Sequence, residues 1–416
     1  MANKAYLVRL YPNKEQAVLI NKTIGCCRKI YNLTLNERSE FYKENKADKA
    51  KLKSHKYKTE KDYKEEFPYL TEVSSRALQQ SRRDLLTAFT NFFKGRASYP
   101  VFKSFHKSKL SYREPQVSST SKRKDGTEAV SLSIRIEENK ISLLKLGLVK
   151  FRGLADDFRG EIKSVTVSKD RTGKYYCSIL TEQEQQRKFR TSNNKIGIDL
   201  GLSNFVTTSD GLQIYPLTRT LLALQKKVVK QQKHLSRKKK GSSRRNKCRI
   251  KLAVLYKKLS NIQKHFFYHL ANLICSENQT IKLETLGIKD MLKNRKRARS
   301  IHRISWFKFI EILKQKAVEF GSEVIQIDRY YPSSKTCSNC KKKKDDLKIT
   351  DRTYVCSCGL QLDRDLNAAI NILNYKSDES SDYKQGEAVR LTKKYFDFHV
   401  SSFVELLTKN ASNCYV

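Results

Sequence analysis

Four cysteines in two close pairs are the residues whose types and spacing most plainly indicate chemistry. Cys337 and Cys340 are separated by two residues, and Cys356 and Cys358 by one. Thiolates on two turns match the ligand set of a tetrahedral structural zinc site, and so short a segment needs a metal to fold. A disulfide, an iron–sulfur site and unrelated buried cysteines are the alternatives. The other cysteines lack pairing spacing, which indicates a reducing compartment and argues against disulfides.

Two aspartates, Asp363 and Asp365, follow the second cysteine pair at the start of a segment with helical spacing. An aspartate at a helix start is often only an N-cap or a partner of the helix dipole. The interpretation of this pair as part of a reactive site therefore depends on carboxylates elsewhere. The apolar residues expected on one face of this helix are Leu366, Ile370 and Leu373.

Two further carboxylates, Asp199 and Glu284, stand at predicted strand ends. Asp199 follows a short apolar run that begins at Lys195, and Glu284 follows a run that begins at Thr280. Carboxylates from two strand ends and a helix start would make an all-oxygen site for Mg²⁺ or Mn²⁺. Such a site can hold two ions, which activate water and stabilise the leaving oxygen in phosphodiester hydrolysis.

The elements that must position these carboxylates follow one another in a definite order. After the strand that ends in Asp199, the sequence predicts a hairpin across Asp210-Gly211, two long antiparallel helices, and the strand that ends in Glu284. A helix over Trp306–Phe320 and a strand over Glu323–Ile327 come next. The long helices are expected over Leu221–Leu235 and Leu252–Ile274, with a hairpin tip over Ser236–Arg249. In the helix over Trp306–Phe320, the residues expected to face inward are Phe309, Ile312, Leu313 and Val318.

The N-terminal half predicts helices followed by short strands. From Lys103 onward, alternating segments with turn signals indicate a small β-barrel, which the first strand is expected to join, so that the helices form an insertion. The individual expectations are a strand over Ala5–Leu10, a helix from an Asn13/Gln16 capping box to Gly25, a helix over Cys26–Lys43, a loop or weak helix over Glu44–Lys64, a helix over Ser74–Phe93 and a strand over Val130–Ile136.

Charge points to a polyanionic partner. Lysine and arginine number 85 against 42 aspartates and glutamates, for a net charge of +43, and nucleic acid is the leading candidate. No apolar run is long enough to cross a membrane, so no membrane partner is expected. No acidic residue lies between Asp210 and Glu277, and a solvated surface is the alternative for each basic stretch. The candidate nucleic-acid contacts are Arg76, Gln79, Arg83, Lys238, Lys239, Arg244, Arg245, Arg295 and Arg297.

Several segments together resemble the TnpB family of transposon-encoded RNA-guided nucleases, which is related to compact type V CRISPR effectors. They are GIDLGLSNFVTTSDG, IKLETLGIKDML, YYPSSKTCSNC and CSCGLQLDRDLNAAINI, with YLVRLYPNKEQ and RALQQSRRDLLTAFTNFFK near the N-terminus. The resemblance implies a multidomain α/β and β fold. It implies an RNase H-like (RuvC) nuclease domain over 190–332 and 362–376, a zinc knuckle over 333–361, a wedge β-barrel over 1–11 and 104–189, and a helical recognition domain over 12–103. The resemblance ends at about Tyr375, where the sequence pattern fades, and residues 377–416 are expected to form a C-terminal tail.

The same resemblance implies an activity and partners. A guide RNA from the transposon end would direct metal-dependent cleavage of double-stranded DNA beside a short transposon-adjacent motif, with one monomer per guide RNA in a prokaryotic cytoplasm, on the nucleoid when bound to DNA. Asp199, Glu284 and Asp365 match the metal carboxylates, and Gln79 matches a glutamine that reads the adjacent motif. The tighter second cysteine pair departs from the usual pattern. A CRISPR effector, a non-cleaving RNA-guided regulator and a DNA-strand transferase remain alternatives.

Overall fold

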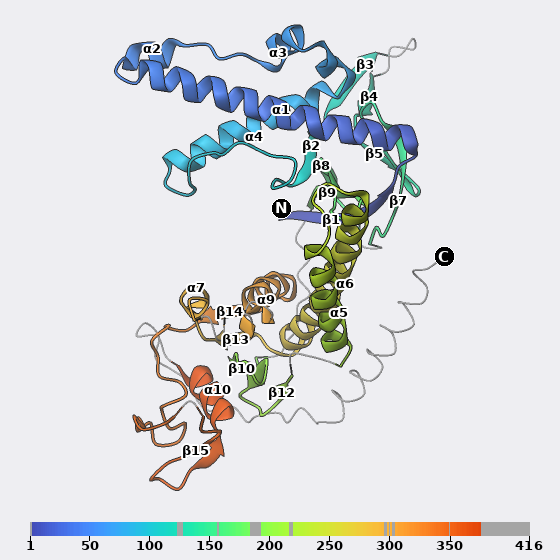
Figure 1. The fold of residues 1–416 in the computed structure, drawn as a ribbon. Coiled ribbons are helices and arrows are strands. Elements are labelled where there is room, and N and C mark those ends of the chain that lie inside the picture. Colours follow the sequence, from blue (N-terminus) through green and yellow to red (C-terminus); the bar gives the residue numbers. More distant parts are fainter. Residues whose placement is uncertain are drawn as a thin grey trace. The chain divides into compact units, whose positions relative to one another are not determined.

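The chain divides into two compact units, Met1–Gln185 and Gln186–Val416, each with its own large sheet (Figure 1). In the computed structural model the described residues are 2–122, 128–155, 158–183, 193–215, 219–294, 298, 300–301, 304–348 and 350–375. Arg295, Arg297 and the expected tail 377–416 lie outside these ranges. Among the described residues no helix is both long enough and apolar enough to cross a membrane.

The first unit is built on a seven-stranded antiparallel sheet with the order β2-β8-β9-β1-β7-β6-β5. The first strand of the chain, β1 (Ala2–Tyr11), lies inside this sheet between β9 and β7, so the prediction that it joins the later strands is confirmed. The other strands are β2 (Leu110–Pro115), β5 (Arg135–Glu137), β6 (Lys140–Leu143), β7 (Gly147–Arg152), β8 (Glu161–Lys169) and β9 (Tyr175–Gln183), while β3 (Ser118–Lys122) and β4 (Glu128–Leu132) form a separate hairpin.

The expected single strand over Val130–Ile136 is wrong, because the chain bends at Ser133 and Ile134 and divides it between β4 and β5. The side chain of Gln116 holds this bend. Its Oε1 accepts hydrogen bonds from Ser133 Oγ at 3.0 Å and from Ile134 N at 2.8 Å, and its Nε2 donates to Ile134 O at 2.9 Å. A single amide side chain thus satisfies backbone groups that a continuous strand would have paired.

The helices of the first unit lie between β1 and β2 in the chain. Asn13 and Gln16 form the predicted capping box, with Gln16 N donating to Asn13 Oδ1 at 2.8 Å and Asn13 N to Gln16 Oε1 at 3.1 Å. The predicted division at Gly25 is wrong, because one helix runs through it. Gly25 costs about 1 kcal/mol in a helix interior, and the buried stripe that continues across it offsets that cost. The helices are α1 (Lys14–Asn45), α2 (Lys49–Ser54), α3 (Glu60–Glu66), a 3₁₀ turn over Pro68–Glu72, and α4 (Ser75–Phe93).

A buried carboxyl lies where α4 meets the sheet of the first unit. Glu114, on β2, is 1% exposed, and neither of its oxygens has a well-formed hydrogen bond, although Ser74 and the backbone of Leu144 lie near it. Burial raises the pKa of Glu114 to about 7, and the nearby groups lower it only in part. The folded chain therefore binds a proton at Glu114 more tightly than the unfolded chain does.

This raised pKa predicts a stability that falls as the pH rises. The folded state holds the proton up to about pH 7, whereas an unfolded glutamate loses it at about pH 4.3, so the stabilisation present at low pH is lost between those values. We expect Glu114→Gln to flatten this dependence and to stabilise the first unit at pH 8, by at most about 4 kcal/mol. Thermal unfolding of both proteins at pH 5 and pH 8 tests this; an equal pH dependence would contradict it.

The second unit contains a five-stranded mixed sheet with the order β12-β11-β10-β13-β14. β10 pairs antiparallel with β11, and β11 with β12, whereas β10, β13 and β14 are parallel. This is the predicted order of a strand, a hairpin and two later strands. The strands are β10 (Lys195–Asp199), β11 (Val206–Thr208), β12 (Gln213–Ile214), β13 (Thr280–Leu283) and β14 (Glu323–Gln326).

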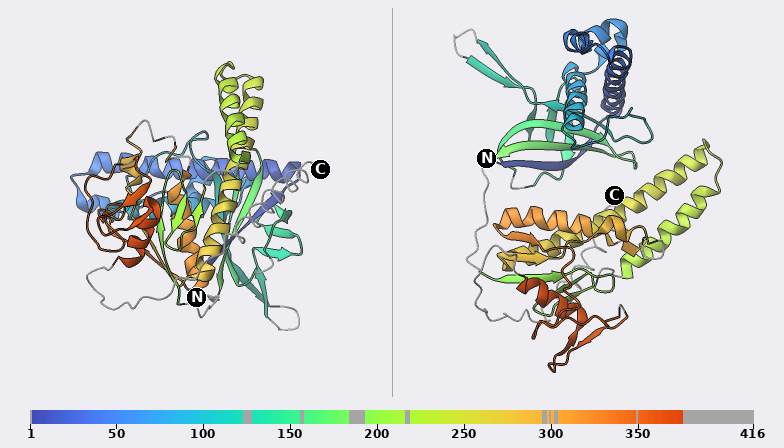
Figure 2. Two further views of the ribbon diagram at one scale, coloured as in Figure 1. Left: turned by 90° about the horizontal axis from the view of Figure 1, so that it is seen from below. Right: turned by 90° about the vertical axis from the view of Figure 1, so that its left-hand side faces the viewer.

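Helices α5 (Arg219–Ser236) and α6 (Ser243–Glu277) form the predicted antiparallel hairpin (Figure 2). The tip is shorter than expected, because Ser242 caps α6 and Cys248 is buried in the hairpin. α7 (Ile288–Met291) and α9 (Trp306–Phe320) follow. Phe309, Ile312 and Leu313 are buried as predicted. The prediction that Val318 also faces inward is wrong, because its side chain is 58% exposed. It lies nine residues after Phe309, about 180° around the helix.

The chain ends its described part with a small hairpin and a helix. These are β15 (Thr353–Val355), β16 (Gln361–Asp363) and α10 (Arg364–Asn374). The predicted apolar face of α10 is wrong, because Leu366, Ile370 and Leu373 are only partly buried, and the fully buried residues are mostly small or polar. The reason is a close approach of backbones, described below. The buried residues are Asn367, Ala368, Ala369, Asn371 and Ile372.

Candidate carboxylate and four-cysteine sites

Asp199 and Glu284 come together at the carboxyl edge of the second sheet. β10 and β13 are parallel, and Ile198 is the register partner of Leu283. The residues that follow this pair are Asp199 and Glu284, and adjacent strands are about 4.8 Å apart. The backbone N–H of Leu200 lies close enough to the Glu284 carboxyl to lower its pKa.

Helix α10 brings Asp365 to the same edge. The helix packs against β10 so closely that a Cβ on Gly197 would overlap the carbonyl oxygen of Ala369 and lie 2.6 Å from the nitrogen of Leu373. Only small groups fit in this contact, which explains why small residues of α10 are buried. Asp365 is in the first turn of the helix, and its negative charge acts on both of the other carboxyls.

Burial and mutual repulsion raise the pKa values of two of these carboxyls. Burial, followed by the charges of Glu284 and Asp365, raises the pKa of Asp199 well above its ordinary value. Burial, with a smaller effect of Asp365, raises the pKa of Glu284 to about 7, although the bond from the backbone of Leu200 lowers it. Carboxyls that share a poorly solvated site cannot all ionise without a cation.

The third carboxyl is held by arginines. Asp365 Oδ1 accepts hydrogen bonds from Arg364 Nη2 at 3.1 Å and Nε at 3.3 Å, and Arg352 Nη1 lies 4.0 Å from Oδ2. Asp363 has a different role, since its Oδ1 accepts hydrogen bonds from the backbone N–H groups of Asp365 and Leu366 at 3.0 Å each and so caps the N-terminus of α10. The two aspartates therefore separate into a capping residue and a residue of the carboxylate centre.

The donor set of this centre fits hard divalent cations, because it consists of carboxyl oxygens, and the pKa values of Asp199 and Glu284 are raised. A second group of potential metal ligands in the described part of the chain is formed by the four cysteines, whose sulfur atoms all lie within 4.8 Å of one another.

The four cysteines converge as the sequence predicts. Cys337 Sγ lies 3.7 Å from Cys358 Sγ, and Cys340 Sγ lies 3.5 Å from Cys356 Sγ. Four sulfurs around a tetrahedral zinc with Zn–S bonds of about 2.3 Å would be about 3.8 Å apart, and a disulfide would need about 2.05 Å. The bond from the backbone of Leu360, the largest cause, lowers the pKa of Cys358 to about 6, which favours the thiolate that a metal binds. The residues fit zinc.

Two buried asparagines join the cysteine segment to α10. Asn367 Nδ2 donates to Thr336 O at 2.8 Å, and its Oδ1 accepts from Ser338 N at 2.9 Å. Asn371 Nδ2 donates to Ser333 O at 2.9 Å and to Thr336 O at 2.6 Å. Sequence analysis missed this role. The signal was present, because two asparagines four residues apart lie on one helix face and disfavour a helix interior unless they are bonded.

The candidate nucleic-acid residues lie in both units. Gln79 and Arg83 are exposed on α4 and Arg76 is half-buried there, whereas their neighbour Gln80 is buried. In the tip of the α5/α6 hairpin, Arg245 Nη1 donates to Leu235 O at 2.8 Å and to Lys238 O at 2.9 Å, so it also closes the end of α5. The exposed candidates of this tip are Lys238, Lys239 and Arg244.

The comparisons with known proteins agree with this architecture of a mixed sheet and a four-cysteine segment. Three family descriptions match: "Cas12f1-like, TNB domain" over 306–372, "Probable transposase" over 178–295, and "Helix-turn-helix domain" over 1–47. The last of these ranges contains a strand and one long helix here. The Cas12f1 chain of a Cas12f1–sgRNA–target DNA complex matches with a TM-score of 0.53 and 14% identity, over 87% of this chain and 83% of that one. The two chains share a fold.

Two relatives match along most of their length. A "Putative RNA-guided DNA endonuclease" of Streptomyces pristinaespiralis is 34% identical over 89% of this chain and 88% of the relative. A protein of Escherichia coli K12 with the same description, InsQ, is 27% identical over 89% of this chain and 91% of the relative. Similarity over this length and at this identity shows the family: the chain belongs to the TnpB family of transposon-encoded proteins.

Proposed function

We propose that this protein is an RNA-guided, divalent-metal-dependent endonuclease that cleaves double-stranded DNA beside a short transposon-adjacent motif. The observation that carries the proposal is the placement of Asp199 and Glu284 as neighbours at one sheet edge, with Asp365 on a helix packed against the same strand. Membership of the TnpB family supports it, since two relatives carry the description of an RNA-guided DNA endonuclease.

The three carboxyls would hold two Mg²⁺ or Mn²⁺ ions. The bound ions supply activation of the attacking water and stabilisation of the leaving oxygen of the phosphodiester. The backbone N–H of Leu200 would stabilise the ionised form of Glu284. Arg364, whose Nη2 lies 3.1 Å from Asp365 Oδ1, would share that carboxyl with the bound ions. Bound cations would displace the protons of Asp199 and Glu284 to solvent, so the raised pKa values of these two carboxyls are compatible with activity at neutral pH.

Each structural part then has an assignment. The segment 333–361 is a zinc knuckle with Cys337, Cys340, Cys356 and Cys358 as ligands, within a RuvC-like nuclease domain of residues 190–332 and 362–376. Residues 1–11 and 104–189 form a wedge-like barrel, and 12–103 form a helical recognition domain inserted in it. The position of α1 to α4 between β1 and β2 supports this division.

The candidate basic residues would contact nucleic acid, and Gln79 would read the adjacent motif. A net charge of +43 supports a structured RNA together with DNA as partners, with one protein chain for each guide RNA. We expect the protein to act in a prokaryotic cytoplasm, on the nucleoid when it is bound to DNA. Three carboxyls at one edge favour cleavage over the non-cleaving alternative.

The RNA-guided function predicts that the purified protein carries one dominant RNA species. The physical reason is that a chain of this charge retains a polyanion, and base pairing by a single RNA would supply the sequence specificity. Sequencing of RNA that copurifies from cells that also contain the transposon end checks the prediction. RNA-free protein, or random fragments only, would overturn the RNA-guided function. A chain with the three carboxyls replaced serves as the control and should retain the same RNA.

A further inference from the structure

A pocket of about 260 Å³ lies in the first unit, where α1, α4 and β2 meet the segment 94–109. It is smaller than pockets for drug-sized ligands, about 300–1,000 Å³, and suits a single nucleotide or a phosphate with part of its sugar. Asp84 is the one carboxylate in its lining, and it is occupied by Arg113 at 3.1 Å and Gln80 at 2.7 Å. The cations left to meet a ligand are Arg28, Lys103 and Lys109.

Lys103 is the central cation of this pocket. Its ammonium lies 3.8 Å from the ring centre of Tyr31, and no carboxylate of a described residue forms an ion pair with it. Its backbone is fixed to α1, since Lys103 N donates to Asn32 Oδ1 at 2.8 Å and Asn32 Nδ2 donates to Lys103 O at 2.9 Å. A fixed, partly buried ammonium without a directly paired carboxylate favours an anionic ligand.

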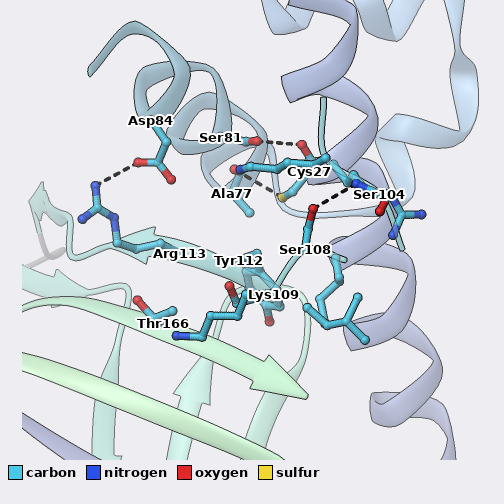
Figure 3. A pocket seen from close by; sticks show the side chains of 15 residues that line it. Cys27, Ala77, Ser81, Asp84, Ser104, Ser108, Lys109, Tyr112, Arg113 and Thr166 are labelled. Atoms are coloured by element: carbon cyan, nitrogen blue, oxygen red, sulfur yellow. Dashed lines mark hydrogen bonds and ion pairs between the residues drawn. The ribbon is translucent and has the colours of Figure 1, made fainter. Parts of the chain in front are cut away.

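Hydroxyl and backbone groups complete the polar wall. Ser108 Oγ accepts from Ser104 N at 2.9 Å, and Ser108 N donates to Ser104 O at 3.0 Å, which closes a compact turn beside Lys103. Ser104 lies at one end of the pocket, and Asp84 and Arg113 lie at the other (Figure 3). The wall therefore offers small donors next to cations, as recognition of a phosphodiester requires.

Exposed aromatic rings stand beside the pocket on the same segment. Phe102 is 57% exposed and Phe105 is 56% exposed. The guanidinium of Arg28 lies 5.5 Å from the ring centre of Phe105. Two large rings in solvent, next to a basic pocket, are unusual for surface packing alone and typical of platforms on which bases stack.

We propose that this pocket and its rings bind one unpaired nucleotide of a nucleic-acid strand. The phosphate lies among Lys103, Lys109 and Arg28, and the adjacent base stacks on Phe105 or Phe102. The segment from Leu85 to Arg113 contains no acidic residue, so the one carboxylate near a strand that follows it is Asp84, which Arg113 pairs at 3.1 Å. The proposal rests on the proposed function only in taking nucleic acid as the partner of the chain.

This site differs from the candidate face of α4 that carries Gln79. The pocket uses Ala77, Ser81 and Asp84, whereas Arg76, Gln79 and Arg83 lie on a face roughly 130° around the helix axis. The rings recognise any base face, so the pocket should prefer single strands over duplex and show little sequence preference.

The test uses the full-length protein, freed of nucleic acid in high salt, with fluorescein-labelled oligo-dT and oligo-U of about eight nucleotides as probes. We expect Phe102→Ala/Phe105→Ala to weaken binding about tenfold with an unchanged salt dependence, since stacking is lost. We expect Lys103→Met, which keeps the apolar stem, to weaken binding and to reduce the slope of log K against log salt by about 0.7. The exposed residues Val101 and Lys150 supply matched controls as Val101→Ala and Lys150→Met.

Competition and cross-linking separate the sources of anion. Thymidine monophosphate should compete better than inorganic phosphate, and 5-iodouracil should cross-link to Phe102 or Phe105. Equal competition by inorganic phosphate overturns the stacking half of the proposal. If Lys103→Met and Lys150→Met lose equal binding affinity, or if cross-links form only outside residues 94–113, the assignment of nucleotide binding to this pocket is overturned. Absence of guide RNA or of DNA cleavage would overturn the proposed function and leave these binding results in place.

Discussion

Replacing Asp199, Glu284 or Asp365 by alanine is expected to reduce cleavage of both DNA strands by several orders of magnitude. Each carboxyl would be a ligand of ions that stabilise charge in the transition state, and removal of such a ligand withdraws stabilisation that appears only during reaction. The three share one sheet edge, and their charges act on one another, so one centre should cut both strands in turn. The assay loads each variant with the same RNA and follows both strands in Mg²⁺.

Target binding should survive these changes, because base pairing and basic contacts supply it. Asp363→Asn is the matched control: it keeps an oxygen that can accept the capping bonds of α10 and removes a charge outside the centre, so cleavage should remain near wild type. If Asp365→Ala cuts while Asp363→Asn does not, the assignment within this pair is wrong. If one strand is cut at full rate by any alanine variant, the single-centre mechanism is wrong.

Replacing Cys337 and Cys356 by serine is expected to remove the zinc and most of the cleavage together. The metal supplies the folding free energy of a segment with little core. Without it, the backbone groups at Ser333, Thr336 and Ser338 that bind the two buried asparagines of α10 lose their positions. Elemental analysis and cleavage assays measure the two effects; iron in the wild type, or undiminished zinc in the variant, would refute the assignment.

Two further variants separate metal loss from loss of the connection. Asn371→Leu should retain zinc and still lower cleavage, because it removes two bonds between α10 and the cysteine segment. Cys248→Ser is the matched control for thiol chemistry, since Cys248 lies in the α5/α6 hairpin, where Gln231 Nε2 donates to its sulfur at 3.0 Å. It should keep both zinc and activity. Full activity in Asn371→Leu would show that the asparagine bonds do not position Asp365.

Local chemistry could be predicted from the sequence wherever a signal lies within a few residues. Asn13 and Gln16 indicate a capping box, Asp210-Gly211 a hairpin, and the spacing of the four cysteines a closed cluster. The neighbouring positions of Asp199 and Glu284 also follow, because the ends of adjacent parallel strands meet at one edge. These features depend on backbone geometry and on ligand chemistry more than on distant packing partners.

Features that depend on a distant partner could not be predicted. The predicted division of the first helix at Gly25 was wrong, because burial of one continuous row of side chains along α1 outweighs the cost of a glycine in a helix. The predicted apolar face of α10 was wrong because β10 approaches the helix at a glycine, so Ala368 and Ala369 are buried while Leu366, Ile370 and Leu373 are only partly buried. The nucleotide pocket was missed for the same reason: Lys103 and Asp84 are brought together only by the packing of α1, α4 and β2.

The contact between Gly197 and α10 also has a consequence for synthesis of the chain. β10 and β13 leave the ribosome early in the second unit, but the helix that carries Asp365 comes after both of them, and its docking surface on β10 is made before the helix itself. Domains generally fold as units, so the second unit cannot complete its carboxyl centre until α10 has left the ribosome. We therefore expect a chain that stops before α10, and so lacks both Asp365 and the helix that covers β10, to be unable to cut DNA.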